Sequence, residues 1–195
     1  MTQRPGQDEA SFMTTAMLKA YSHPLRRRLL RELARLGPSR AADLAEAIGK
    51  PANQISFHLR VLADVGWVED APELARDRRD RVWRAVRGAT NIGSPEHPMV
   101  DEAAGAMALA GFQADVLELT QRVMAWGPRF VSGEDPEVRG IAAGGGVNLT
   151  RAEFVEMWER IQGVVSEFAD KHDDGGAAEG VHFFQYSFIA GDETI

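Results

Sequence analysis

The chain has 195 residues, no cysteine and a formal net charge of −7. It therefore cannot form disulfide bonds or thiolate metal sites, and its length suffices for one large or two small domains. No apolar run approaches the ~20 residues that a membrane helix needs, and residues 1–12 lack the apolar core of a secretion signal. These features together predict a cytoplasmic protein.

Charge is distributed unevenly along the chain. Residues 18–87 contain 15 lysines and arginines against 9 aspartates and glutamates, a net charge of +6, so the remainder carries −13. A basic module on an acidic chain favours a polyanionic partner for that module alone. The alternative is that solvated faces of opposite charge happen to segregate.

The first elements are helical. Residues 1–11 are polar and are predicted to be disordered, and residues 12–36 have helical periodicity. His23-Pro24 should break or kink this helix, because proline disfavours the α conformation in the residue before it. After the break, leucines recur at helical spacing, which predicts a buried stripe. This stripe consists of Leu25, Leu29, Leu33 and Leu36.

Two short helices follow. Ser39 is the expected N-cap of a helix over residues 40–48, and Gly49 suits its C-terminal end. Pro51 is expected to occupy the first turn of a helix over residues 51–65. A turn of about three residues between two short helices is typical of a helix-turn-helix.

The helix over residues 51–65 has two different faces. Leu59 and Leu62 fall within about 40° of Ile55 at helical spacing, which predicts a buried stripe. The opposite side carries residues that can reach outward from the first two turns. These are Asn53, Gln54, Ser56, Phe57 and Arg60. A recognition helix in the major groove presents its N-terminal residues to base edges in this way.

A basic wing is predicted next. Residues 67–70 and 81–86 are rich in β-branched and aromatic residues, which indicates two short strands. The segment between them, residues 71–80, carries Arg76, Arg78 and Arg79, and with Arg81 it makes up a basic wing over residues 71–81. A helix-turn-helix followed by a hairpin with a basic tip is a winged helix, and the tip can reach phosphates or a minor groove.

Residues 88–98 form a predicted linker between a DNA-binding domain over residues 12–87 and a second domain over residues 99–195. In the second domain, helices are expected over residues 99–126 and 150–170, and a strand over residues 181–190. Thr150 and Glu153 form a predicted capping box. The predicted fold is mainly α with a small β-wing: a winged helix-turn-helix domain plus a helical C-terminal dimerisation region that ends in a strand.

The segment over residues 18–70 resembles the ArsR-type winged-helix regulators. Its "HPLR" start, its "ADLAEAIG" helix and its "SFHLRVLADVG" recognition helix match the family's pattern. The resemblance implies a homodimeric DNA-binding transcriptional regulator, by family habit a repressor. The chain departs from the founding metal sensors because it has no cysteine pair. It also has Lys50 where a Ser or Thr N-cap is usual, which places a cation where a phosphate could lie.

The recognition helix, its flanks and the wing supply the predicted DNA contacts. They are Ser39, Arg40, Lys50, Asn53, Gln54, Ser56, Phe57, His58, Arg60, Arg76, Arg78, Arg79 and Arg81. His58 lies near the buried edge of its helix, so a partly structural role is the favoured alternative for it. Phe57 could contact a thymine methyl group or lie under the wing.

The other classes of function are less well supported. No nucleophile elbow, P-loop or His-Glu-x-x-His motif indicates an enzyme. The five histidines are not paired at metal-ligand spacing, so neither a metal nor a cofactor is predicted, and the acidic "DKHDD" is better explained as a solvated helix end. A winged helix that binds protein instead of DNA is an alternative.

The C-terminal half is predicted to form the core and an apolar, obligate homodimer interface. Small residues along helix 99–126 would let a partner helix approach closely, and Met13, Met17 and Leu18 add an apolar stripe. The alternative is an effector pocket for a small molecule, lined by large apolar side chains. Its candidate residues are Phe112, Trp126, Phe130, Trp158, Phe183, Phe184, Tyr186 and Phe188.

Overall fold

A computed structural model of the protein describes residues 11–76, 81–86, 90–94, 96–172 and 180–195. The chain divides into two compact units, Met1–Asp115 and Val116–Ile195. The predicted disorder at the N-terminus and the tip of the predicted wing lie outside the described residues. Within those residues, no helix has the length and apolar character needed to cross a membrane.

The first helical segment is broken at the predicted place. A short strand β1 (Ser11–Phe12) precedes α1 (Thr15–Tyr21), and α2 (Pro24–Leu36) follows directly after His23. His23 caps α2, because its Nδ1 accepts a hydrogen bond from the Leu25 amide at 3.2 Å. The break at His23-Pro24 is therefore confirmed, and the imidazole satisfies one amide that the helix start leaves unpaired.

The next two helices form the predicted helix-turn-helix. They are α3 (Ala41–Ile48) and α4 (Ala52–Asp64). Gly49 ends α3 in the left-handed conformation with φ of 71°, which a residue without a Cβ adopts at no steric cost. The predicted N-cap at Ser39 is wrong. Ser39 lies in β2 (Ser39–Arg40), where it pairs with Trp83, and the helix begins two residues later.

A three-stranded antiparallel sheet completes the winged helix. Its order is β2, β4 (Val82–Ala85) and β3 (Val68–Asp70), with a short 3-10 helix η1 (Pro72–Leu74) after β3. The hairpin register pairs Val68 with Ala85 and Asp70 with Trp83. Both strands of the predicted wing are thus confirmed. A separate pair joins β1 to β5 (Thr90–Asn91) in parallel.

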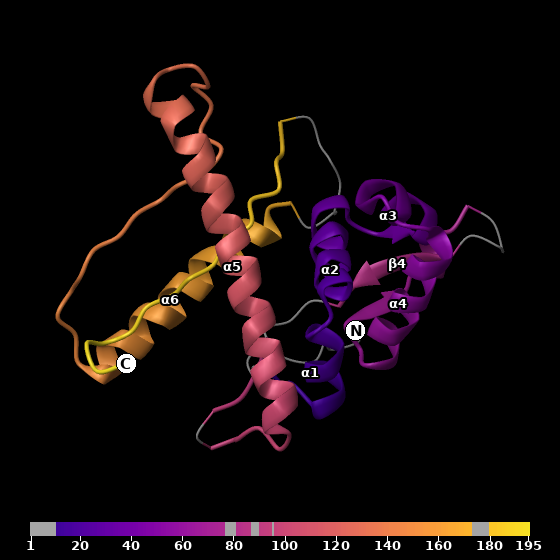
Figure 1. Ribbon diagram of the computed structural model, residues 1–195, viewed down its shortest axis with the longest axis horizontal. Helices are drawn as coiled ribbons and strands as arrows, with labels where there is room; N and C mark the ends of the chain where they lie inside the picture. Colours follow the sequence, from indigo (N-terminus) through magenta and orange to yellow (C-terminus); the bar gives the residue numbers. More distant parts are fainter. Residues whose placement is uncertain (1–10, 77–80, 87–89, 95, 173–179) are drawn as a thin grey trace, which may run out of the picture. The chain divides into compact units, whose positions relative to one another are not determined.

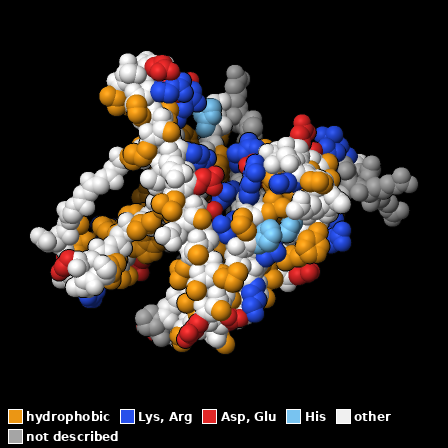
Figure 2. All heavy atoms as spheres, viewed as in Figure 1, with side chains coloured by type: hydrophobic (Ala, Val, Ile, Leu, Met, Phe, Trp, Pro, Cys, Tyr) orange, Lys and Arg blue, Asp and Glu red, His pale blue; other side chains and the backbone are white. Residues whose placement is uncertain are grey.

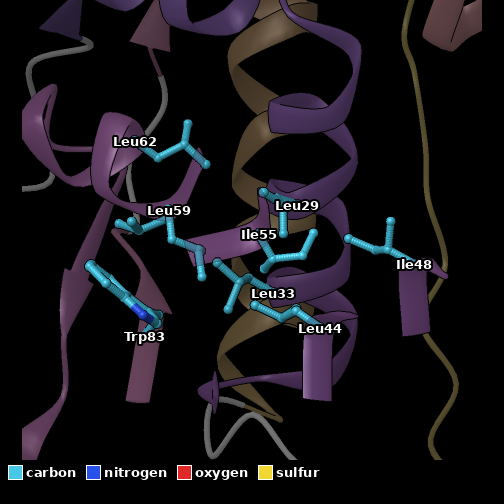
Figure 3. Packing of buried hydrophobic residues seen from close by; sticks show 9 residues of the cluster. Leu29, Leu33, Leu44, Ile48, Ile55, Leu59, Leu62 and Trp83 are labelled. Carbon is cyan, nitrogen blue, oxygen red and sulfur yellow. The ribbon is translucent and has the colours of Figure 1, made fainter. Parts of the chain in front are cut away.

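The main core lies between α2, α3, α4 and the sheet, which are labelled together in Figure 1. The helices contribute leucine and isoleucine side chains at helical spacing, and the sheet contributes Val68 and Trp83 (Figure 3). Ile55, Leu59 and Leu62 are fully buried, as predicted from the periodicity of their helix. This packing holds α4 by one face only, which leaves its other face at the surface.

The small residues of the long helix α5 (Glu102–Val131) pack inside the first unit. Ala104 and Ala108 are buried against Leu18 of α1. A Cβ on Gly111 would lie 2.5 Å from Nη1 of Arg27, so a larger residue here would displace the Arg27 side chain. We predicted that the small residues admit a helix of a second copy. These three instead serve contacts within the chain, because α1 and α2 already occupy that side of α5.

The second unit contains the rest of α5 and α6 (Arg151–Asp170). The Thr150–Glu153 capping box is present, with the Thr150 amide donating to Glu153 at 2.8 Å. Helix α5 continues to Val131, five residues beyond the predicted end at 126. The prediction of a strand over residues 181–190 is wrong for the single chain. The segment has no ladder partner among the described residues, and a strand exists only as part of a ladder.

Candidate nucleic-acid interface

The exposed face of α4 is the centre of the candidate interface. Asn53, Gln54, Phe57 and Arg60 are exposed, and Ser56 is half-buried, while the opposite face of the same helix lies in the core. Phe57 retains 58% of its accessible surface, although phenylalanine is among the residues most often buried. The predicted outward residues of the recognition helix therefore share one surface.

Local hydrogen bonds set what the first turns of α4 can offer a ligand. The Asn53 Oδ1 accepts from the Gln54 amide at 2.9 Å, and the Ser56 hydroxyl donates to the Ala52 carbonyl at 2.8 Å. Among the described residues, the Gln54 side chain makes no hydrogen bond with another protein group. Its amide can therefore donate and accept at once, whereas the Ser56 hydroxyl in this rotamer has only acceptor capacity left.

His58 lies on the other side of α4 and contacts His23 at the start of α2. The two rings have centroids 4.6 Å apart, and only 6% of His58 is exposed. Its Nδ1 is buried and has no hydrogen-bond partner among the described residues. Burial lowers the pKa of His58, and the charges of His23 and Arg26 lower it further. The imidazole therefore supports the α2–α4 contact in its neutral form.

His23 is subject to the same constraint. Burial lowers its pKa, and the nearby Arg26 and Arg27 lower it further, although a hydrogen bond to its own backbone opposes them. Protonation of Nδ1 would also remove the acceptor that caps α2. Both histidines therefore need to be neutral for α2 and α4 to pack as they do.

Acid is expected to destabilise the first unit through this pair. Because both pKa values lie below the ordinary value near 6.5, the unfolded chain binds more protons as the pH falls through that value. The free energy of unfolding should therefore decrease between about pH 7.5 and pH 5.5. Urea titrations at both pH values measure this change.

Two variants test whether the histidine pair causes it. The His58→Asn variant should lose less stability than the wild type over this pH range. The His172→Asn variant, changed at an exposed position after α6, should lose as much as the wild type. Equal decreases in all three proteins would contradict this role.

The described part of the wing carries basic residues that are mostly neutralised. Arg81 forms an ion pair with Asp70 at 2.7 Å and lies over the Trp83 ring. Arg84 pairs with both Glu69 and Glu73. We did not expect these acidic partners. Glu69 lies opposite Arg84 in the hairpin register, whereas Asp70 is paired with Trp83 and Glu73 lies in η1.

Other basic residues of the wing differ in their surroundings. Arg76 is exposed. The predicted contacts Arg78 and Arg79 lie outside the described residues. Lysine and arginine side chains are spread over the first unit, next to hydrophobic and histidine side chains (Figure 2).

The remaining predicted contacts divide into surface and buried positions. Lys50 is exposed in the turn before α4. Arg40 is half-buried and forms hydrogen bonds with Asp43, which lower the pKa of that carboxyl. Ser39 is only 7% exposed, and its hydroxyl donates to the Gly37 carbonyl at 2.9 Å. Of the eleven predicted contacts that lie within the described residues, Ser39 and His58 are therefore the two that the fold buries.

Two residues outside the prediction, Arg27 and Asp115, connect α2 to α5. Arg27 is 6% exposed, and its Nε donates to the Asp115 carboxylate at 3.0 Å. Asp115 also pairs with Arg31 at 2.7 Å. Arg27 is not among the predicted DNA contacts. Its partner lies 88 residues further along the chain, and no local pattern indicates it.

Comparison with known proteins gives one family match. Residues 21–70 match the model of a family described as a helix-turn-helix domain. This part of the chain is a helix-turn-helix domain. It comprises α2, β2, α3, α4 and β3, and such a domain places its second helix in the major groove of DNA. The match supports a DNA-binding transcription regulator.

The other comparisons add little. No curated protein matches the chain. A solved structure of a mutant of Lactococcus lactis ZitR is similar over 86% of this chain and 82% of that chain, with 12% identity and a TM-score of 0.33. In the described residues, no three His, Asp or Glu side chains are grouped as they would be around a metal ion.

Proposed function

We propose that this protein is a homodimeric, ArsR-type transcriptional repressor that binds a specific site in double-stranded DNA. The exposed first turns of α4 carry the proposal. They combine an amide side chain with free donors and acceptors, a hydroxyl acceptor, an aromatic ring and a cation on one surface. These groups can form hydrogen bonds and apolar contacts with base edges in the major groove.

Charge supports the same assignment. The net charge of +6 over residues 18–87 faces a partner that carries one negative charge per phosphate. Lys50 and Arg60 are exposed at either end of the recognition surface, where they can contact the backbone on both sides of the groove. The proposed contacts are Arg40, Lys50, Asn53, Gln54, Ser56, Phe57, Arg60, Arg76, Arg78, Arg79 and Arg81. Ser39 and His58 are buried and are not among them.

Selection of bound duplexes from a random pool tests the proposal directly. A regulator of this kind should enrich one sequence, and its affinity should fall steeply as the salt concentration rises, because bound phosphates release counterions. A winged helix that binds only protein would enrich no sequence. That result would refute the proposal.

The wing should contribute phosphate contacts. Replacing Arg76, Arg78 and Arg79 by alanine should weaken binding to all duplexes and reduce the slope of log affinity against log salt by about one per lost contact. Arg84→Ala is the matched control, because this arginine already pairs with Glu69 and Glu73. Gel shifts over a range of salt concentrations measure both slopes. A slope that stays unchanged in the triple variant would place the wing away from the DNA.

A homodimer is the proposed assembly because one recognition helix contacts too few base pairs to distinguish one site in a genome. Helix-turn-helix proteins overcome this limit by binding as two-fold symmetric dimers. Exposed apolar side chains of α5 support it, since Met107, Leu117 and Met124 are each more than half exposed. Such residues are normally covered when they occur in groups. Sedimentation of the full chain at micromolar concentration should give the mass of a dimer.

A small-molecule effector pocket is less well supported. A groove of about 460 Å³ lies along α6 and is lined by apolar residues such as Met157, Ile161 and Val164. None of the aromatic residues that we considered for such a pocket lines it. Two of them, Trp126 and Phe130, instead contact each other, with tilted rings whose centroids are 4.9 Å apart. We therefore assign the exposed apolar side chains of this half to assembly.

A further inference from the structure

Residues 181–190, with the sequence VHFFQYSFIA, are an extended segment without a backbone partner. Among the described residues, none of their amides or carbonyls forms a hydrogen bond with another backbone group. Phe184, Tyr186 and Ile189 are 58%, 62% and 68% exposed. The segment thus presents both an open row of backbone groups and large apolar side chains.

Contacts with its own unit hold this segment in place. The Gln185 Oε1 accepts a hydrogen bond from Nη2 of Arg122 on α5 at 2.7 Å. The Phe188 ring stacks on Trp158 of α6 with centroids 5.2 Å apart. An extended segment anchored at two points keeps its backbone available in a fixed place, as the edge strand of a sheet does.

The composition of the segment is that of a strand. Valine, isoleucine, phenylalanine and tyrosine make up six of its ten residues, and these types are enriched in strands. It contains no Asp, Glu, Lys or Arg, and His182 is its one titratable group besides Tyr186. Pairing with an identical segment would therefore place no like charges opposite each other.

The chain itself offers a poor alternative partner. Residues 136–149 are described and likewise form no backbone–backbone hydrogen bond. They include Pro136, Gly140 and the run Gly144–Gly146, and both residue types are depleted in strands. Within the same unit, no described residue is fully buried, and hydrophobic side chains lie along the surface of α6 in Figure 2.

We propose that residues 181–190 pair in antiparallel with the same residues of a second copy, so that a two-stranded ladder crosses the two-fold axis of the dimer. The inference rests on the proposed homodimer and locates one of its contacts. An isologous interface requires each patch to complement itself, and a neutral, apolar antiparallel strand satisfies that requirement. The ladder would satisfy the open backbone groups and cover Phe184 and Tyr186.

A cysteine scan tests this pairing in the full chain, which contains no native cysteine. Single substitutions from His182→Cys to Ile189→Cys would be oxidised and the covalent dimer measured on non-reducing gels. In an antiparallel ladder, each step away from the axis separates the two copies of a residue by about 7 Å, twice the rise of a strand. Disulfides require Cα atoms within about 7 Å. Cross-linking should therefore peak at one position, or at two adjacent positions, and fall on both sides.

Ala34→Cys, at an exposed position of α2, is the control for random collision. Sedimentation of the unmodified chain separates the two possible failures. A dimer with no peak above the control overturns the ladder but leaves the homodimer intact. A monomer overturns both. A peak at one position in a protein that sediments as a dimer supports both, and circular dichroism of each variant shows whether the substitution has disturbed the fold.

Discussion

Replacing Asp115 by alanine is expected to lower the free energy of unfolding of the first unit by about 3 kcal/mol. The carboxylate is 16% exposed and pairs with both Arg27 and Arg31. Removing one partner of a buried ion pair costs about 3–5 kcal/mol, because the other charge stays buried without compensation. The low end applies here, since Arg27 keeps the Ser22 and Tyr21 carbonyls as acceptors.

A double variant separates the cost of an unpaired charge from the worth of the pair. Exchanging a buried pair for apolar residues is often nearly neutral. Arg27→Met combined with Asp115→Leu should therefore be more stable than Asp115→Ala alone. Urea unfolding followed by tryptophan fluorescence measures the change, with Trp67 and Trp83 reporting on the first unit. A loss below about 1 kcal/mol for Asp115→Ala would mean that solvent screens the pair as it does at a surface.

This ion pair also shows why local patterns could not predict every part of the fold. The break at His23-Pro24, the helix-turn-helix and the wing strands depend on proline, glycine and the spacing of apolar residues, which act within a few positions. These elements were predicted close to their observed bounds. Arg27 and the exposed Arg28 are adjacent residues of the same type, and the contact of Arg27 with Asp115 of α5 is not indicated by any local pattern.

The same reasoning applies to the candidate interface and to the end of the chain. Periodicity predicted the exposed side of α4 and placed His58 near its buried edge, but it gave no indication of the contact with His23, which depends on how α2 crosses α4. The strand predicted over residues 181–190 followed from composition. Composition indicates that a segment is able to form a strand. A strand also needs a partner strand, and the described part of this chain supplies none for residues 181–190.

The second large effect concerns sequence recognition. Replacing both Gln54 and Ser56 by alanine should reduce the preference for the selected site over random duplex by about 2–4 kcal/mol, because each good base contact contributes about 1–3 kcal/mol and neighbouring contacts are not fully additive. That corresponds to a loss of at least about 30-fold in discrimination. Non-specific binding should change little, since neither residue is charged.

The hydrogen bonds of α4 predict how the two single variants differ. The Gln54 amide can form two hydrogen bonds with adenine, so Gln54→Ala should relax the preference at an A·T position. The Ser56 hydroxyl donates to the Ala52 carbonyl, which leaves it able only to accept, from the amino group of cytosine or adenine. Ser56→Ala should therefore have the smaller effect.

Stability should not complicate the comparison. Gln54 is exposed, and alanine is the best helix former, so both substitutions should preserve or slightly stabilise α4. Lys50→Ala is the matched control, because a lost phosphate contact should weaken binding to all sequences alike and leave the preference intact. Binding of the four proteins to the selected site and to a scrambled duplex, at one salt concentration, gives the discrimination of each. If the double variant kept the wild-type preference, α4 would not be the helix that reads the bases.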